Sequence, residues 1–104
     1  MATAETNIMN ACMVALSAAG CLVWRNNAGV LKDASGRPIR YGLCVGSADL
    51  IGVAPDGKFL AVEVKTATGR TSEAQDRFIA AVLRLGGRAG VARSPEGAVR
   101  IATG

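Results

Sequence analysis

Two short apolar stretches joined by a turn sequence constrain this chain more than any other feature. Residues 47–53 (SADLIGV) and 59–66 (FLAVEVKT) are rich in β-branched and aromatic residues, which favour strands. Between them stands the sequence APDGK, whose Pro, Asp and Gly each have a physical preference for turns. The sequence therefore predicts a β-hairpin at the centre of the chain.

The length of the turn decides which side chains face each other across this hairpin. A two-residue turn would place Asp49 opposite Val64. A three-residue turn that ends on a left-handed Gly57 places Asp49 opposite Glu63 instead. We prefer the three-residue turn because Pro55 suits its first corner and glycine suits the position that needs a positive φ.

In the preferred register, two carboxylates lie side by side on one face of the hairpin, and Lys65 follows Glu63 on the same face. Like charges opposite each other on a sheet are destabilising, and partial burial raises the pKa of one carboxyl group. A cation nearby would relieve the repulsion. The residues alone leave two interpretations open: an ion pair between Lys65 and Glu63, or a divalent metal ion between Asp49 and Glu63.

A helix is predicted before the hairpin, over residues 3–19. Apolar residues recur there at three-to-four spacing and Gly20 ends the run; the members of this stripe are Ile8, Cys12, Ala15, Leu16 and Ala19. Glu5 falls on the first turn. An acid at this position either complements the helix dipole or is directed toward the sheet, and its position alone favours the first explanation.

A second helix is predicted after the hairpin, over residues 72–85. Ser72 and Gln75 match the S-x-x-Q capping box, and capping alone would explain Gln75. The stripe expected to be buried consists of Phe78, Val82 and Leu85, with Ile79 beside it.

Two further strands are predicted, one on each side of these elements. Residues 21–26 (CLVWRN) form the first, with Leu22 and Trp24 on one face. Residues 88–93 (RAGVAR) form the last, which a right-handed crossover through the second helix would join to the hairpin. Residues 94–97 then begin a short terminal segment.

A polar, basic and flexible loop is expected over about residues 28–40. Positive charge gathers around it and in the linker before the second helix; the candidates for contact with nucleic acid are Arg25, Lys32, Arg37, Arg40 and Arg70. A mobile basic loop suits the phosphate backbone of DNA or RNA. An ordinary solvated hairpin tip would have the same composition.

Composition bounds the class of protein. The chain has 104 residues and forms one domain, residues 1–104, with a net charge of +4. Nine of its twelve cationic residues are Arg, which favours a polyanionic partner. Hydrophobic residues make up 50% of a chain too small to bury them all, so we expect part of them to be covered by a partner, most simply a second copy.

The reactive residue types exclude several classes of site. There is no histidine, and the three cysteines form no CxxC pair, which leaves almost no material for zinc sites, Ser-His or Cys-His catalysis, or haem ligation. The thiols are expected to be reduced, as in a cytosolic protein. No secretion signal or membrane anchor is expected, so the predicted location is the cytoplasm.

The ordered set of elements resembles the PD-(D/E)xK nuclease superfamily and, within it, the VRR-NUC family. The matching segments are LVWRNNAG, YGLCVGSADLIGV, FLAVEVKTATGRTSEAQDRF and GGRAGVARS, which are spread over residues 22–94. The resemblance implies an α/β fold with a restriction-endonuclease-like αβββαβ core, in which helices flank a mixed central sheet. Ala48 departs from the pattern, because the superfamily name expects Pro there.

The resemblance also implies roles for individual residues. The metal ligands implied are Glu5, Asp49, Glu63 and the carbonyl of Val64, and the metal is Mg²⁺ or Mn²⁺. The catalytic residues implied are Asp49, Glu63, Lys65 and Gln75, with Lys65 either activating the attacking water or acting as an electrostatic clamp.

The activity implied is metal-dependent, structure-selective cleavage of DNA, in particular of four-way (Holliday) junctions, by a homodimer. Two alternatives stay open: a non-catalytic DNA-binding or assembly module with the nuclease fold, and a generic nuclease that nicks linear duplex. Stand-alone members of the family are common in phage genomes, which would place the protein in the cytoplasm of a host cell.

Overall fold

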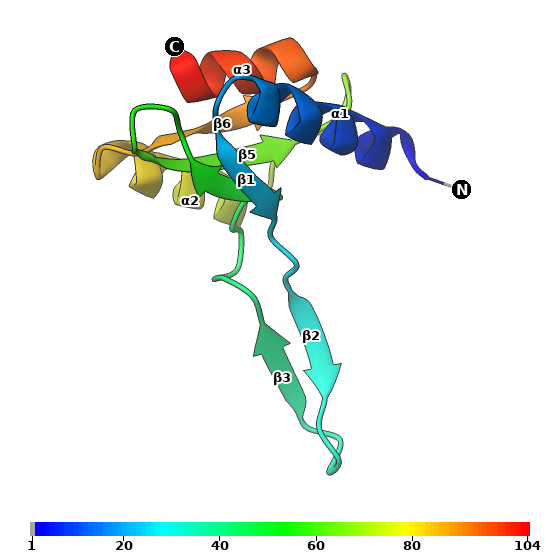
Figure 1. Ribbon diagram of the computed structural model, residues 1–104. Coiled ribbons are helices and arrows are strands. Elements are labelled where there is room, and N and C mark those ends of the chain that lie inside the picture. The colour runs from blue at the N-terminus through cyan, green and yellow to red at the C-terminus, as the bar shows by residue number, and fades with distance from the viewer. Residues whose placement is uncertain (1) are drawn as a thin grey trace.

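The central hairpin forms in the preferred register in the computed structural model, which describes residues 2–104 (Figure 1). Its strands are β4 (Leu50–Val53) and β5 (Phe59–Val64). Val53 pairs with Phe59, and the Ala54 N–H donates to the Lys58 carbonyl at 2.8 Å. The three-residue turn is confirmed.

A mixed four-stranded sheet is built on this hairpin, in the order β1-β4-β5-β6. β1 (Leu22–Arg25) pairs antiparallel with β4, and β6 (Arg88–Ala92) pairs parallel with β5. The helices are α1 (Ala4–Ala18), α2 (Glu73–Arg84) and α3 (Pro95–Thr103). Leaving out the additions described below, the order α1, β1, β4, β5, α2, β6 is the predicted αβββαβ core.

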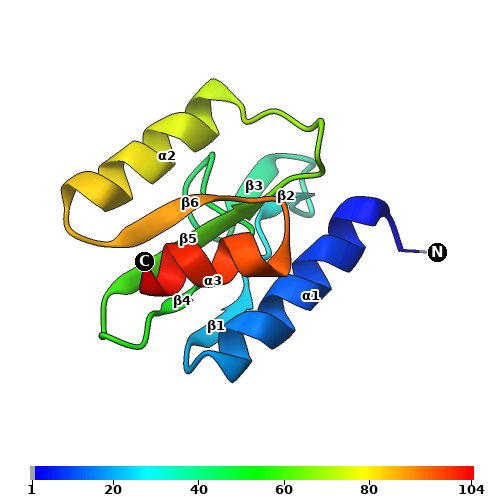
Figure 2. The ribbon, with the colours of Figure 1, turned by 90° about the horizontal axis from the view of Figure 1, so that it is seen from above.

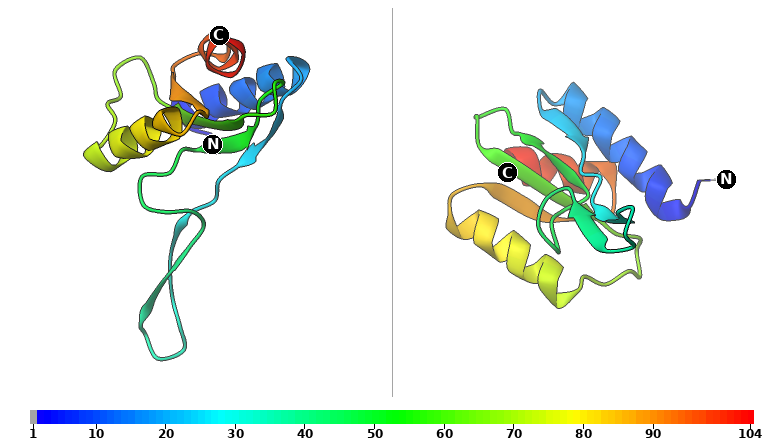
Figure 3. Two further views of the ribbon diagram at one scale, coloured as in Figure 1. Left: turned by 90° about the vertical axis from the view of Figure 1, so that its left-hand side faces the viewer. Right: turned by 90° about the horizontal axis from the view of Figure 1, so that it is seen from below.

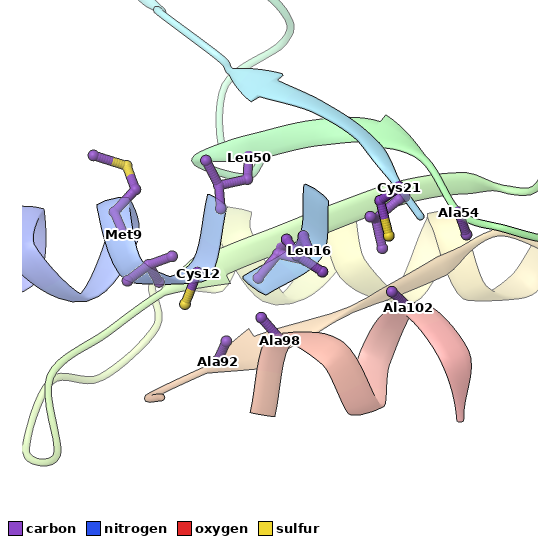
Figure 4. Close-up of a cluster of buried hydrophobic side chains, with 12 residues drawn as sticks. Met9, Cys12, Leu16, Cys21, Leu50, Ala54, Ala92, Ala98 and Ala102 are labelled. Atoms are coloured by element: carbon purple, nitrogen blue, oxygen red, sulfur yellow. The ribbon is translucent and has the colours of Figure 1, made fainter. Parts of the chain in front are cut away.

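One face of the sheet is covered by α1 and α3 and the other by α2 (Figures 1 and 2). The larger core lies under α1 and α3, where Cys12 and Leu16 are fully buried against the sheet residues Leu50, Leu60 and Val62. Figure 4 shows side chains of α1, the sheet and α3 gathering in this cluster. Each fully buried leucine contributes roughly 1.5–3 kcal/mol of stability.

The helix α2 covers only part of the sheet face on which it packs. Phe78 and Val82 of α2 pack on a smaller cluster formed by Ala48, Ile51 and Ala61. Leu85 was expected in this buried stripe, but it lies beyond the last residue of α2 and is 81% exposed. The part of this face formed by β1 and the turn ends of β4 and β5 keeps large apolar side chains exposed, namely Leu22, Trp24, Val53 and Phe59.

The segment expected to be a flexible basic loop is an ordered hairpin, in line with the alternative considered for it. β2 (Gly29–Lys32) and β3 (Pro38–Tyr41) pair antiparallel in a sheet of their own. Asp33 organises the tip, because its Oδ1 accepts hydrogen bonds from the backbone N–H groups of Ser35 and Arg37. We call residues 29–41 the arm. It extends away from the sheet on the side of α2 (Figures 1 and 3).

The segment after β6 is also more regular than expected. Residues 94–97 begin the helix α3, in which the Ser94 hydroxyl caps the Gly97 N–H and Pro95 occupies the first turn. Both are common signals of a helix start. α3 supplies Ala98 and Ala102 to the core, and these small side chains let the helix lie close to α1 and the sheet.

The three thiols are free, with Cys12 and Cys21 buried and Cys44 exposed. Burial raises the pKa of the Cys12 and Cys21 thiols, which keeps them protonated. Among residues 2–104, no helix is both long enough and apolar enough to cross a membrane.

Candidate active site

The pairing of β4 with β5 stops at Asp49, and the candidate site lies at this break. The register would next join the Val64 N–H to the carbonyl of Ala48. Instead, the Val64 N–H donates to Asp49 Oδ2 at 2.9 Å. The strand predicted from residue 47 therefore begins only at Leu50, because the Asp49 side chain takes the place of a backbone acceptor.

Asn26 holds the strand end that carries Asp49. Its backbone N–H donates to the Asp49 carbonyl at 2.8 Å, and its Nδ2 donates to Ser47 Oγ at 2.7 Å and to the Ala48 carbonyl at 3.0 Å. The Ala48 carbonyl that β5 leaves free is thus satisfied. The sequence analysis missed this role of Asn26, and the available signal was an amide directly after a strand in the segment LVWRNNAG.

Glu63 is the one buried charged residue among those described, with 2% of its surface exposed. Its Oε1 accepts a 3.3 Å hydrogen bond from the Asp49 N–H, which brings the two predicted carboxylates together. Its Oε2 lies 3.3 Å from Lys65 Nζ and accepts a 2.6 Å hydrogen bond from Gln75 Nε2. Four predicted catalytic residues therefore meet at the end of β5.

Gln75 completes the cap predicted for α2 and also contacts Glu63. Its Oε1 accepts from the Ser72 N–H at 2.8 Å and its N–H donates to Ser72 Oγ, which completes the capping box of α2. The opposite end of the same amide donates to Glu63. The cap therefore fixes the side chain that orients the buried carboxylate.

The environment of Glu63 disfavours its negative charge. Burial, followed by the negative charge of Asp49, raises the pKa of Glu63 from its ordinary 4.5 to about 7, although Lys65 acts in the opposite direction. A protein gains nothing in stability from such a carboxylate. A bound cation would compensate the negative charge of Glu63, so the electrostatics of Asp49 and Glu63 suit the binding of a cation.

Glu5 of α1 lines the same cavity as Asp49. Together with Arg25 and Asn26, these acids line a cavity of about 330 Å³, completed by Thr3, Thr6 and Met9. Glu5 is exposed on the first turn of α1, which Thr3 caps. The structure therefore places an acid pair and a cation around one opening at the end of the sheet.

The donor set fits a hard divalent cation. No three acidic or cysteine side chains in the described part of the chain converge on one metal position; Asp49 contacts Glu63 and shares a cavity with Glu5. Mg²⁺ usually needs only one or two protein carboxylates, because it retains several waters. The Val64 N–H points at Asp49, and the N–H and C=O of a residue in a strand share a side, so the Val64 carbonyl faces the same region.

The cationic residues predicted to contact nucleic acid lie in three places. Arg25 lines the cavity that Glu5 and Asp49 share, which we call the acid cavity, while Lys32, Arg37 and Arg40 are exposed on the arm. Arg37 also lies 3.6 Å from Asp33 within the arm.

The third place is the linker between β5 and α2, where Arg70 is exposed. Arg93 holds this linker, because its guanidinium donates to the carbonyls of Thr66 and Gly69. The sequence analysis did not assign a role to Arg93.

Comparisons with known proteins give a matching family and a solved structure of similar fold. A family model described as the VRR-NUC domain matches residues 13–96, which include the β4–β5 break and α2 but not Glu5. A solved structure described as a VRR_NUC domain has 24% sequence identity and a TM-score of 0.66, over 96% of this chain and 95% of that chain. This likeness shows a shared fold. None of the curated proteins compared with the chain matches it.

Proposed function

The chain belongs to the VRR-NUC family, and from this premise we propose that it is a metal-dependent, structure-selective DNA endonuclease that cleaves four-way junctions as a homodimer. The family makes it a nuclease-like domain with DNA as its substrate. The observation that carries the proposal is the pair Asp49 and Glu63, joined to Lys65 and Gln75 where the sheet opens.

Each side chain has a task in phosphodiester hydrolysis. Asp49 and Glu63 would hold Mg²⁺ or Mn²⁺, with Glu5 and the Val64 carbonyl as further ligands. The metal, when bound, supplies a water of lowered pKa and neutralises charge on the phosphate. Gln75 keeps the Glu63 carboxylate in one orientation.

Lys65 is the remaining charged group of the site. Its ammonium beside Glu63 orients the attacking water and stabilises the negative charge that develops as the P–O bond breaks.

Positively charged side chains outside the Asp49–Glu63 site would hold the DNA. Arg25 stands in the acid cavity, where a phosphate entering the site would meet a guanidinium beside the acid pair. Lys32, Arg37, Arg40 and Arg70 extend the positive surface along the arm and the β5–α2 linker. Two such subunits related by a twofold axis would present two active sites, as paired cuts across a junction require. The free thiols suit a reducing compartment such as the cytoplasm.

The test compares a labelled four-way junction with linear duplex of the same sequence, in Mg²⁺, in Mn²⁺ and with chelator. We expect symmetric, metal-dependent cuts in the junction alone. Asp49→Asn should abolish cleavage while junction binding persists, because the side-chain oxygen of Asn can still accept the Val64 hydrogen bond. Lys65→Ala, purified in parallel, excludes a contaminating nuclease.

The other outcomes identify the competing functions. Equal cutting of linear duplex would retain the active site but show a generic nicking nuclease. Tight binding without cleavage in any metal would show a non-catalytic DNA-binding module. Full activity of Asp49→Asn would refute the assignment of the metal ligands.

A further inference from the structure

The arm presents two chemically different faces. Cross-strand pairing sets Leu31 opposite Ile39 and Gly29 opposite Tyr41, so one face carries three large side chains. These three, Leu31, Ile39 and Tyr41, are 64%, 51% and 45% exposed, and we call them the arm face. The opposite face carries Lys32 and Arg40 together with Val30. The arm is therefore amphipathic, although no other element of this chain covers its apolar side.

A second apolar surface lies on the sheet, where α2 does not reach. Leu22 pairs with Val53 and Val53 pairs with Phe59, so side chains from three adjacent strands are direct neighbours on one face. Trp24 follows Leu22 on that face of β1. We call this set the sheet patch: Leu22, Trp24, Val53 and Phe59, which are 65%, 47%, 37% and 43% exposed.

The two surfaces share a side of the molecule but do not cover each other. The arm leaves the sheet on the side of α2, the side on which the sheet patch lies, and extends away from it (Figures 1 and 3). An isolated two-stranded hairpin is at best marginally stable in water. An arm of this kind gains stability when its apolar face packs on another surface, and its own sheet patch is out of reach.

The exposed area matches what a stable dimer needs. Taking about 200 Å² for a whole aromatic side chain and about 100 Å² for an aliphatic one, the seven side chains expose on the order of 500 Å². Protein interfaces are roughly 60% apolar, so a surface of this content corresponds to roughly 800 Å² per partner, the standard size of a specific interface.

We propose that the arm face of each copy packs on the sheet patch of a second copy, in a reciprocal twofold dimer. This inference rests on the homodimer of the proposed function and names the surfaces that form it. Reciprocal exchange uses the same two surfaces on both subunits, which closes the assembly at two. None of the seven side chains carries a charge, so these surfaces of two subunits of net charge +4 can meet without burying like charges.

The arrangement also separates the two tasks of the arm. Lys32 and Arg40 stay on the side turned away from the partner, where they can contact the phosphates of DNA. One face of the hairpin thus joins the subunits while the other remains free.

Sedimentation of the metal-free, DNA-free protein tests the assembly. We expect a dimer at micromolar concentration, and a monomer from Leu31→Glu combined with Ile39→Glu and, separately, from Trp24→Glu. Val30→Glu combined with Pro38→Glu is the matched control, since it places the same two charges on the opposite face of the same two strands, and it should remain dimeric. Circular dichroism checks that every variant is folded.

Crosslinking tests which surfaces meet. In a background with the exposed Cys44 replaced by Ser, chains carrying Leu31→Cys are mixed with chains carrying Trp24→Cys and treated with a short bismaleimide. We expect a covalent dimer from the mixture and none when Val30→Cys replaces Leu31→Cys. The native Cys12 and Cys21 are buried and give no background.

The outcomes keep this inference apart from the proposed function. A monomeric wild type, or a dimer that survives both the arm and the Trp24 substitutions without specific crosslinking, overturns the inference whatever the protein cleaves. Specific crosslinking in a dimer that cleaves no DNA supports the inference and refutes the nuclease.

Discussion

Replacing Glu63 by Gln removes the one buried carboxyl group whose charge the structure disfavours. Glutamine has nearly the same shape but does not titrate. We therefore expect the variant to lose a pH-dependent penalty on folding, so that its stability, relative to the wild type, increases as the pH rises.

The magnitude follows from the pKa of Glu63, which rises from 4.5 to about 7 on folding, first because of burial and then because of Asp49. Below about pH 4.5 the group is protonated in both states and adds no pH dependence. Between about pH 4.5 and 7 the unfolded chain releases its proton first, so stability falls as the pH rises. At about 1.4 kcal/mol per pKa unit, the complete loss is on the order of 3 kcal/mol.

Urea denaturation at about pH 4.5 and about pH 8.5, in chelator, measures the effect through the linkage of proton binding to folding. The wild type should lose on the order of 3 kcal/mol more than Glu63→Gln between the two conditions. Two other carboxyl groups also have shifted pKa values. A hydrogen bond from Ser35 is the main cause that lowers the pKa of Asp33, and one from Arg88 is the main cause for Asp56. Both groups are present in both proteins, so their contributions cancel. Identical pH dependence in the two proteins would refute the account of a penalised Glu63.

Three further substitutions test other parts of the structure. Arg37→Ala with Arg40→Ala should weaken junction binding and reduce its dependence on salt, and an unchanged salt slope would remove the arm from the DNA-binding surface. Asn26→Ala should cost about 1 kcal/mol in a urea titration but reduce cleavage more than tenfold, because Asp49 loses its support; a cleavage rate equal to that of the wild type would contradict this role. Leu16→Ala should destabilise the fully buried α1 contact by roughly 2–5 kcal/mol, and a smaller effect in thermal unfolding would indicate that the core relaxes around it.

The centre of the fold could be predicted because its determinants are local. Pro55 and Gly57 specify the turn, the turn specifies the register, and the register brings Asp49 level with Glu63. The capping box of α2 could likewise be predicted from Ser72 and Gln75. The pairing of Asp49 with Glu63 and the cap at Gln75 thus follow from short-range sequence signals, whereas their roles in a catalytic site were implied only by the family resemblance.

The remainder depends on contacts between distant segments. An amide directly after a strand was the one signal at Asn26, and it does not reveal that this amide satisfies the Ala48 carbonyl, since that group is free only because Asp49 interrupts the ladder. The arm was predicted as a flexible loop, with a hairpin tip as the alternative, because its strands are short and polar at the tip. Leu85 continued the apolar spacing of α2 but fell beyond the helix end, where no facing layer exists.

The packing of α1 against α3 has a consequence for synthesis. The face of α1 that carries Cys12 and Leu16 is completed by Ala92 and Ala98, and Cys12 Sγ lies 3.5 Å from the Ser94 carbonyl. A ribosome adds about 5–20 residues per second, so α1 leaves it several seconds before its partner helix exists. Until then Glu5 has no fixed position beside Asp49. We therefore expect the cavity that Glu5 shares with Asp49 to take shape only once residues 92–102 have emerged.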